Sequence, residues 1–194
     1  MGGPGRRAGG QDDGVSTPSL GRITTVPALD RTDLLAPPVA AVLAGWEHAA
    51  EVGVVEIDPA VADTAAMAEA YEIGMDTGAN CVVVAGRRDG QERVAACLVR
   101  ADTRADVNTL VKRLLDVRKC SFLPMDRAVE ESGMEYGGIT PVGLPADWRL
   151  LLDTRVAEMD VAVIGSGVRR SKLLVPGRLL PLLPGAEVVE GLAG

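Results

Sequence analysis

Apolar residues recur at helical spacing in two segments of the chain. The first begins after Asp33 and has two prolines in its first turn, where a missing N–H does no harm. The second opens at Thr103 or Arg104 and has the clearest amphipathic pattern in the sequence, so we expect a regular helix there. Shorter helices are predicted for 63–74, 124–133 and 178–183. The two apolar faces consist of Val39, Val42, Leu43 and Trp46, and of Val107, Leu110, Val111, Leu114 and Leu115.

Short apolar runs bounded by glycine, proline or aspartate predict strands between these helices. The runs 80–85 and 93–99 flank the turn sequence GRRDGQ, so we expect them to pair as a β-hairpin. Because hairpins are mixed with single helices, the pattern predicts an α+β fold with a curved, mixed or antiparallel β-sheet and surrounding helices. The other predicted strands are 52–58, 120–123, 150–153, 161–164, 172–175 and 187–189.

Residues 1–30 differ in composition from the rest of the chain. They are rich in glycine, proline, serine and threonine and include almost no large apolar side chains, so burial cannot offset the entropy lost on ordering. We predict a disordered tail over 1–30 and one folded domain over 31–194. No apolar run approaches the roughly 20 residues that span a bilayer, and the start lacks the apolar segment of a signal peptide. We expect a cytoplasmic protein without a membrane partner.

The net charge of −7 is distributed unevenly. Residues 1–79 hold 4 Lys and Arg against 12 Asp and Glu, whereas residues 80–194 hold 16 against 15. Local basic groups at 87–88, 112–119 and 169–172 suit either a solvated face or phosphate contacts. The overall acidity argues against DNA as a partner, and an aromatic content of 3% argues against extensive base stacking.

Residues that commonly carry catalysis are scarce. Cys81, Cys97 and Cys120 are odd in number and lie in apolar runs, which favours buried, inert thiols over nucleophiles or metal ligands. With His48 as the single histidine, neither a histidine-rich metal site nor a Ser/His/Asp triad is readily assembled. We therefore expect neither a metal nor a cofactor.

The segment from Gly133 to Pro145, GMEYGGITPVGLP, holds four glycines and two prolines in thirteen residues. This composition excludes a regular helix or strand and predicts a loop of defined shape. The residues alone allow either a tight structural corner or a place where backbone N–H groups meet a ligand. A second glycine turn, 165–167, lacks the third glycine of a dinucleotide fingerprint, and is either a plain β-turn or the edge of a pocket.

These segments, in this order, resemble the YbaK/EbsC family, the free-standing relatives of the editing domain of bacterial prolyl-tRNA synthetases. The resemblance extends over about Leu34 to Val189. Its most specific part is VRKCSFLPMDRAVEESGMEYGGITPVGL, residues 117–144, which is similar to the family's passage from strand through helix to a G-G-x-x-P-x-G loop. It continues through RLLLD, which ends at Asp153, and through IGSGVRRSKLLV, residues 164–175.

The resemblance implies a trans-editing aminoacyl-tRNA deacylase, which hydrolyses the ester of a mischarged tRNA carrying a small amino acid. Its partners would be the aminoacylated acceptor end of a tRNA and a synthetase. Backbone N–H groups of the glycine loop would stabilise the oxyanion by roughly 3 kcal/mol for each well-placed donor, without a side-chain nucleophile. The implied site residues are Asn80, Gly137 and Gly138 for catalysis, and Ile139, Thr140, Pro141, Gly165, Ser166, Gly167 and Arg169 for substrate binding.

The sequence departs from the family at Asn80. The characterised branches carry a lysine there, in a pattern like K-T-L-V, where this chain has Asn-Cys-Val-Val. An amide donates two hydrogen bonds but has no charge, and losing one charge-assisted contact would slow the reaction about ten- to hundredfold. Three hypotheses follow: a deacylase of a divergent branch, a catalytically weak or inactive module that binds an aminoacyl-tRNA end or a small ligand, and a protein of this fold with another small substrate.

Overall fold

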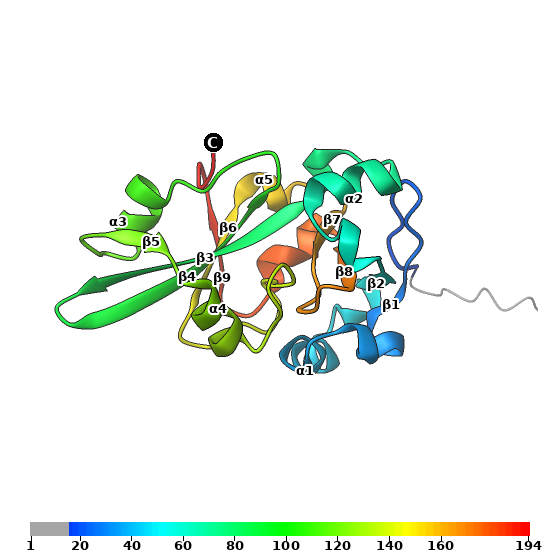
Figure 1. Cartoon of the computed structure of the whole chain (residues 1–194), viewed down its shortest axis with the longest axis horizontal. Helices are drawn as coiled ribbons and strands as arrows, with labels where there is room; N and C mark the ends of the chain where they lie inside the picture. Colours follow the sequence, from blue (N-terminus) through cyan, green and yellow to red (C-terminus); the bar gives the residue numbers. More distant parts are fainter. Residues whose placement is uncertain (1–15) are drawn as a thin grey trace, which may run out of the picture.

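The computed structural model describes residues 16–194, which form an α+β arrangement of short helices and two sheets (Figure 1). The α-helices are α1 Pro37–Gly45, α2 Thr64–Tyr71, α3 Lys112–Leu114, α4 Met125–Ser132 and α5 Thr154–Ala157. The strands are β1 Val26–Pro27, β2 Gly53–Glu56, β3 Ala79–Arg88, β4 Gln91–Arg100, β5 Cys120–Phe122, β6 Arg149–Asp153, β7 Ala162–Gly165, β8 Ser171–Val175 and β9 Ala186–Val189. Short 3-10 helices span Ala28–Leu34, Ala49–Glu51, Pro59–Val61, Met75–Thr77 and Gly177–Leu182.

The strands are divided between two sheets. The first has five strands in the order β5-β3-β4-β6-β9, in which β5, β3 and β4 are antiparallel and β4, β6 and β9 are parallel. The second is antiparallel, in the order β1-β2-β8-β7. β5 pairs only with residues 84–86 of β3, and a bridge between Gly78 and Val163 brings the other end of β3 to β7. The predicted α+β fold is confirmed, with two sheets in place of one.

Strand β4 lies at the centre of the core because both of its faces are buried. From Val94 to Val99 every side chain is at most 8% exposed. Alternate residues of this strand enter two different apolar clusters, one shared with α1 and the second sheet, the other shared with 107–117. The two-residue turn at 89–90 sets the register of β3 against β4, in which Asn80 pairs with Val99.

Ordered chain begins before residue 31, which corrects the predicted boundary of the N-terminal tail. β1 pairs with β2, and Ile23 is 1% exposed in an apolar cluster with Ile57 and Met67. A few apolar side chains are enough to anchor this segment because they are placed where it crosses the second sheet. Residues 1–15 lie outside the described residues, so the tail predicted there stays a prediction.

The segment predicted as a regular helix from Thr103 is a π-helical turn, Val107–Val111, followed directly by the single turn α3. The preceding residues pair with the C-terminal segment, where Arg104 N–H donates to the Gly194 carbonyl at 3.0 Å. They are therefore unavailable to a helix, and the Asp106 side chain caps the turn by accepting two backbone N–H groups. The predicted apolar face, with the exception of Leu110, still packs against the first sheet.

The predicted start of α1 and the predicted end of α4 are confirmed. Prolines fill the first turn of α1, and Gly133 ends α4 with a left-handed φ of 65°. Asp63 precedes α2 as predicted, but its side chain makes no capping hydrogen bond. The helix ends at Tyr71, and the left-handed cap is Glu72 in place of the predicted Gly74. None of the helices within 16–194 has the length and apolar character needed to cross a bilayer.

Candidate functional site

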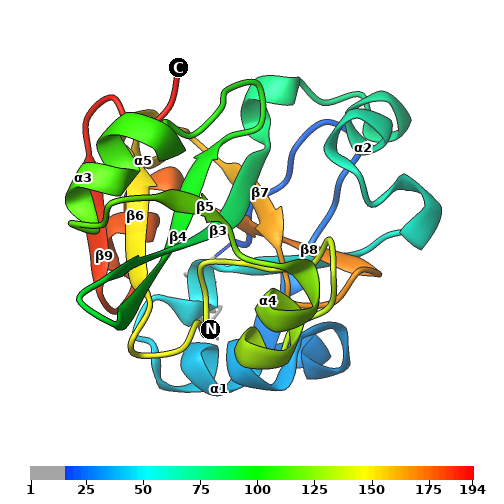
Figure 2. The same ribbon diagram turned by 60° about the vertical axis from the view of Figure 1, so that its left-hand side comes forward.

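A cavity of about 380 Å³ lies where the two sheets meet. β3 and β7 form neighbouring walls, α2 lines one side, and the loop between α4 and β6 lines another. Figures 1 and 2 both show β3 beside β7, with α2 at the same end of the molecule. The lining includes Asp63, Thr64, Asn80, Cys81, Tyr136, Gly137, Ile139, Gly165 and Lys172.

The cavity brings together part of the set of residues expected from the sequence. Asn80, Gly137, Ile139 and Gly165 line its walls, although they come from three separate segments of the chain. The rest of the expected set is not part of the lining, namely Gly138, Thr140, Pro141, Ser166, Gly167 and Arg169.

Asn80 lies near the start of β3 and is held by the first residue of α2. Its Oδ1 accepts a hydrogen bond from Thr64 Oγ1 at 3.1 Å. With the carbonyl oxygen engaged in this way, the two N–H donors of the amide remain for a ligand. Asn80 is therefore an oriented, neutral hydrogen-bond donor.

The glycine loop presents only part of its backbone to the cavity. Gly138 N–H donates to the Glu135 carbonyl at 2.9 Å, inside the loop's own turn, so it is not available as an oxyanion donor in this conformation. Gly137 has a φ of 77°, a conformation that favours glycine. Gly137 and Ile139 line the cavity, and their N–H groups have no acceptor among the residues that the structure describes. The same holds for the N–H group of Tyr136, so the loop has three unpaired backbone donors among the residues that line the cavity.

Thr140 and Pro141 belong to the glycine loop but do not line the first cavity. Thr140 is fully buried, and its Oγ1 has no hydrogen-bond partner within 16–194. Pro141 lines a second, apolar cavity of about 260 Å³ together with Trp148. Neither residue is placed to touch a ligand in the first cavity.

The glycine loop and the β7–β8 turn are locked together by backbone contacts. Gly167 N–H donates to the Gly138 carbonyl at 2.8 Å, and Glu135 N–H donates to the Gly167 carbonyl at 2.8 Å. A Cβ atom on Gly138 would lie 2.8 Å from the backbone of Val168, and one on Gly165 would lie 2.3 Å from the Gly138 carbonyl oxygen. Any larger residue at these glycines would therefore force the two loops apart.

Ser166 fastens the β7–β8 turn to the segment before α1. Its buried Oγ lies 2.7 Å from Ser171 Oγ, which in turn donates to the Leu34 carbonyl at 2.5 Å. These contacts occupy the hydroxyl, so the geometry gives Ser166 a structural position behind the cavity.

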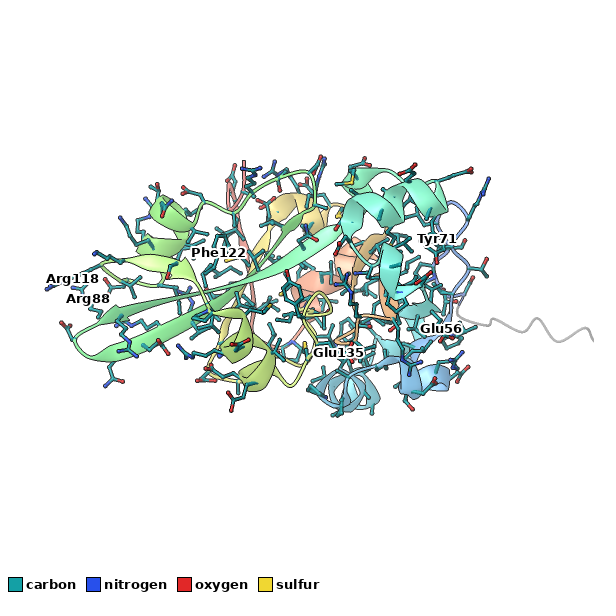
Figure 3. The ribbon with its side chains drawn as sticks, viewed as in Figure 1. Glu56, Tyr71, Arg88, Arg118, Phe122 and Glu135 are labelled. Atoms are coloured by element: carbon teal, nitrogen blue, oxygen red, sulfur yellow. The ribbon has the colours of Figure 1, made fainter. Side chains whose placement is uncertain are left out.

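Arg169 lies beside the cavity, close to Gly137. Its backbone N–H donates to Glu135 Oε2 at 2.6 Å, and its guanidinium lies 3.6 Å from the Asp63 carboxylate. Figure 3 shows Glu135 on the loop between α4 and β6, in the middle of the molecule. A Cβ atom on Gly137 would lie 2.6 Å from the guanidinium, so the glycine allows this cation to approach the loop. The exposed ion pair adds little stability but places both charges near the cavity.

Lys172 lines the cavity from β8 and is absent from the set of residues that the sequence predicted. Its side chain is half-buried and makes no ion pair or hydrogen bond with any residue that the structure describes. Burial lowers the pKa of Lys172, the charge of Arg169 lowers it further, and Asp63 raises it. The only sequence signal that could have identified Lys172 as a site residue was a lysine within the otherwise apolar strand SKLLV. Strand alternation alone does not tell which face borders a cavity.

The cysteines have the properties of inert thiols. Burial raises the pKa of Cys81, which lines the cavity, and the neighbouring Cys97 raises it further. Burial likewise raises the pKa of Cys97 to about 12. Both thiols are therefore protonated at neutral pH and are poor nucleophiles.

His48 lies outside the cavity lining and packs edge-on against Trp46. Within residues 16–194, no group of three or more His, Cys, Asp or Glu side chains is arranged to hold a metal ion.

A family model shows the family of this chain, and two solved structures show its fold. A family model described as the aminoacyl-tRNA editing domain matches residues 58–181, a range that includes every lining residue named above. The crystal structure of a proposed trans-editing enzyme for prolyl tRNA synthetase is similar, with a TM-score of 0.66, 22% identity, and coverage of 80% of this chain and 94% of that one.

A second crystal structure, of a protein described only as hypothetical, has a TM-score of 0.63 and 21% identity, and covers 73% of this chain and 90% of its own. At these identities the two structures show a shared fold. No protein of curated function matches the sequence.

Proposed function

The chain belongs to the family of aminoacyl-tRNA editing domains, and on this premise we propose that it hydrolyses the ester of a mischarged tRNA that carries a small amino acid. The observation that carries the proposal is the cavity at the junction of the sheets, where Asn80, Gly137 and Ile139 face one space. The acyl group and the terminal ribose would enter this space together.

The chemistry requires a water molecule and a place for negative charge. Water attacks the ester carbon, and the carbonyl oxygen becomes an oxyanion. Collapse of this intermediate breaks the bond to the ribose oxygen, which takes up a proton and leaves as the free hydroxyl of the tRNA. The N–H groups of Gly137 and Ile139 would stabilise the oxyanion by roughly 3 kcal/mol for each well-placed donor, and the Asn80 amide would orient the ester.

The size and lining of the cavity support a small acyl group. Its volume of about 380 Å³ is near the lower end for ligand sites. Met67, Val163 and Ile164 contribute apolar walls. Each methylene group added to or removed from the acyl side chain would change the discrimination by about 1–3 kcal/mol.

The partner of this cavity would be the acceptor end of a tRNA. Tyr136 is 64% exposed and lines the cavity, so its ring offers a surface on which the terminal base can stack. A synthetase would be the second partner and would supply the identity of the tRNA.

A binding module without hydrolysis is the second candidate function, and Asn80 is the observation that favours it. The neutral amide stands where relatives carry lysine, so the cavity retains its shape while losing a charge at that position. Binding of the aminoacyl end would then persist without acceleration of ester cleavage.

Release of amino acid from a panel of misacylated tRNAs tests the proposal, with alanyl and cysteinyl species on proline tRNA included. We expect wild type to accelerate release and Gly138→Val to abolish the acceleration, because its side chain forces the loop away from Val168. Asn80→Ala should slow release about tenfold through the lost hydrogen bonds, and Asn80→Lys should retain or raise the rate.

Two other results would decide against hydrolysis. If wild type releases no amino acid but still shifts tRNA in a binding assay, the binding module replaces the deacylase. If it neither hydrolyses nor binds, both tRNA functions fail, and a thermal-shift screen of small ligands becomes the next experiment.

A further inference from the structure

Lys172 is a half-buried cation that no group of the described chain neutralises directly. It lines the cavity from β8, an interior strand of the second sheet. The charged groups that act on it are Arg169, which repels it, and Asp63, which lies 3.6 Å from the Arg169 guanidinium. A cation removed from water without a partner costs free energy. An anion that enters the cavity as part of the ligand would pair with Lys172 and offset this cost.

The residue type adds a second, independent argument. The chain contains 17 arginines and only three lysines, so arginine supplies nearly all of its cations. An ammonium is a compact point charge that fits a narrow space and contacts single oxygens, whereas a guanidinium is a broad planar fork suited to paired acceptors. Lysine at position 172 suits a small cavity and one anionic group.

The proposed substrate has one group close to its ester that is negatively charged throughout the reaction. The amino group of the acyl moiety is cationic, the ester is neutral, and the oxyanion exists only during the reaction. The phosphate on the 5′ side of the terminal adenosine is present throughout. A phosphate and an ammonium form a charge-assisted contact that is stronger than a neutral hydrogen bond.

We propose, on the basis of the proposed function, that Lys172 binds the 5′-phosphate of the terminal adenosine of the substrate tRNA. Asn80 and Lys172 line the same cavity from different sheets. The cation that relatives carry on the strand equivalent to β3 is thus supplied here from β8. Lys172 is a binding residue in this assignment, and its contact forms in the ground state.

The test uses 3′-deoxy-3′-alanylamino-adenosine, an end analogue that cannot be hydrolysed, prepared with and without a 5′-phosphate. Calorimetry with the full chain gives Kd for both forms. We expect wild type to bind the phosphorylated form about tenfold more tightly. Lys172→Gln should bind the two forms equally, and Asn80→Lys in the Lys172→Gln background should restore part of the preference. Lys119→Gln, at an exposed lysine outside the cavity lining, is the matched control and should keep the full preference.

The remaining outcomes are distinct. If Lys172→Gln keeps the wild-type preference, or if wild type binds both forms equally, the phosphate contact is wrong while the proposed function stands, because the cavity still binds the aminoacyl end. If folded wild type binds neither form, the proposed function fails and the inference fails with it. Lys172→Met is measured in parallel, since its unbranched side chain fits the half-buried position if the glutamine variant does not fold.

Discussion

At the scale of single residues, Asp153 shows how one buried carboxylate joins distant parts of the chain. It is 1% exposed at the end of β6, where it accepts hydrogen bonds from Arg155 N–H at 3.0 Å and from Ala193 N–H at 2.9 Å. Burial by itself raises the pKa of Asp153, but the hydrogen bonds from the Arg155 guanidinium and from the two N–H groups outweigh burial and lower it below 3.8. The charged form is therefore favoured in the folded protein.

Asp153→Asn should lower the free energy of unfolding by about 2 kcal/mol at pH 7, because charge-assisted bonds become neutral ones. A carboxylate with a depressed pKa stabilises the fold fully above its unfolded value of 3.8, and this stabilisation is lost as the pH falls through the lower folded value. Urea unfolding at pH 7 and near pH 3 should show the difference from wild type shrinking in acid. The exposed Asp147→Asn is the control. An equal loss at both pH values would contradict this role.

The contrast between Asn80 and Lys172 shows how far site residues are predictable from the sequence. Asn80 was predictable because a strand, a turn and a loop at recognisable spacings fix its place in the family pattern. Lys172 was not, although its strand was predicted correctly. Its role depends on how the second sheet meets β3, which is set by long-range contacts such as the Gly78–Val163 bridge.

At the scale of elements, the glycine loop and the β7–β8 turn act as one unit, and Gly138→Ala tests this. Gly138 does not have a positive φ, so the substitution adds only a methyl group, placed 2.8 Å from the backbone of Val168. We expect a loss of about 1–3 kcal/mol in the free energy of unfolding and slower deacylation. Gly45→Ala, which adds the same methyl group in open space at the end of α1, should leave stability unchanged or slightly higher. Equal stability of the two variants would show that the loops are not tightly locked.

Element boundaries were predictable where local chemistry decides them. Prolines start α1 and Gly133 ends α4. Each of these boundaries depends on residues within one helical turn of it. The segment after Thr103 was mispredicted because its first residues pair with Gly194 and its neighbours, a contact across 90 residues that no local pattern contains. The tail boundary failed for the same reason, since Ile23 is buried by a distant sheet.

At the scale of the whole molecule, few of the cations within residues 16–194 lie close to the cavity. Figure 3 shows Arg88 and Arg118 at the opposite end of the molecule from Tyr71, the last residue of α2. Helix α2 lines the cavity through Thr64 and Met67. Arg88 also pairs with Asp116. The basic residues near the β3–β4 turn are therefore far from the cavity. Among the residues that the structure describes, Arg169 and Lys172 are the cations beside it.

Binding of tRNA should consequently depend only weakly on salt. With about two phosphate contacts, log K should fall with log salt concentration with a slope of about −1.5, because each contact releases a fraction of a counterion. Filter binding over roughly 50–200 mM KCl measures this slope. A slope steeper than about −4 would show that surfaces beyond the cavity, including the basic residues near the β3–β4 turn, contact the tRNA backbone.

Whether this cavity hydrolyses aminoacyl esters is decided by a single-turnover measurement, with the full chain in excess over labelled alanyl-tRNA carrying the proline anticodon. We predict that wild type releases alanine faster than buffer does, and that Gly138→Val, whose loop is forced off Val168, releases it at the buffer rate. Release at the buffer rate by folded wild type that binds the same tRNA would contradict the assignment of this cavity as a deacylase site.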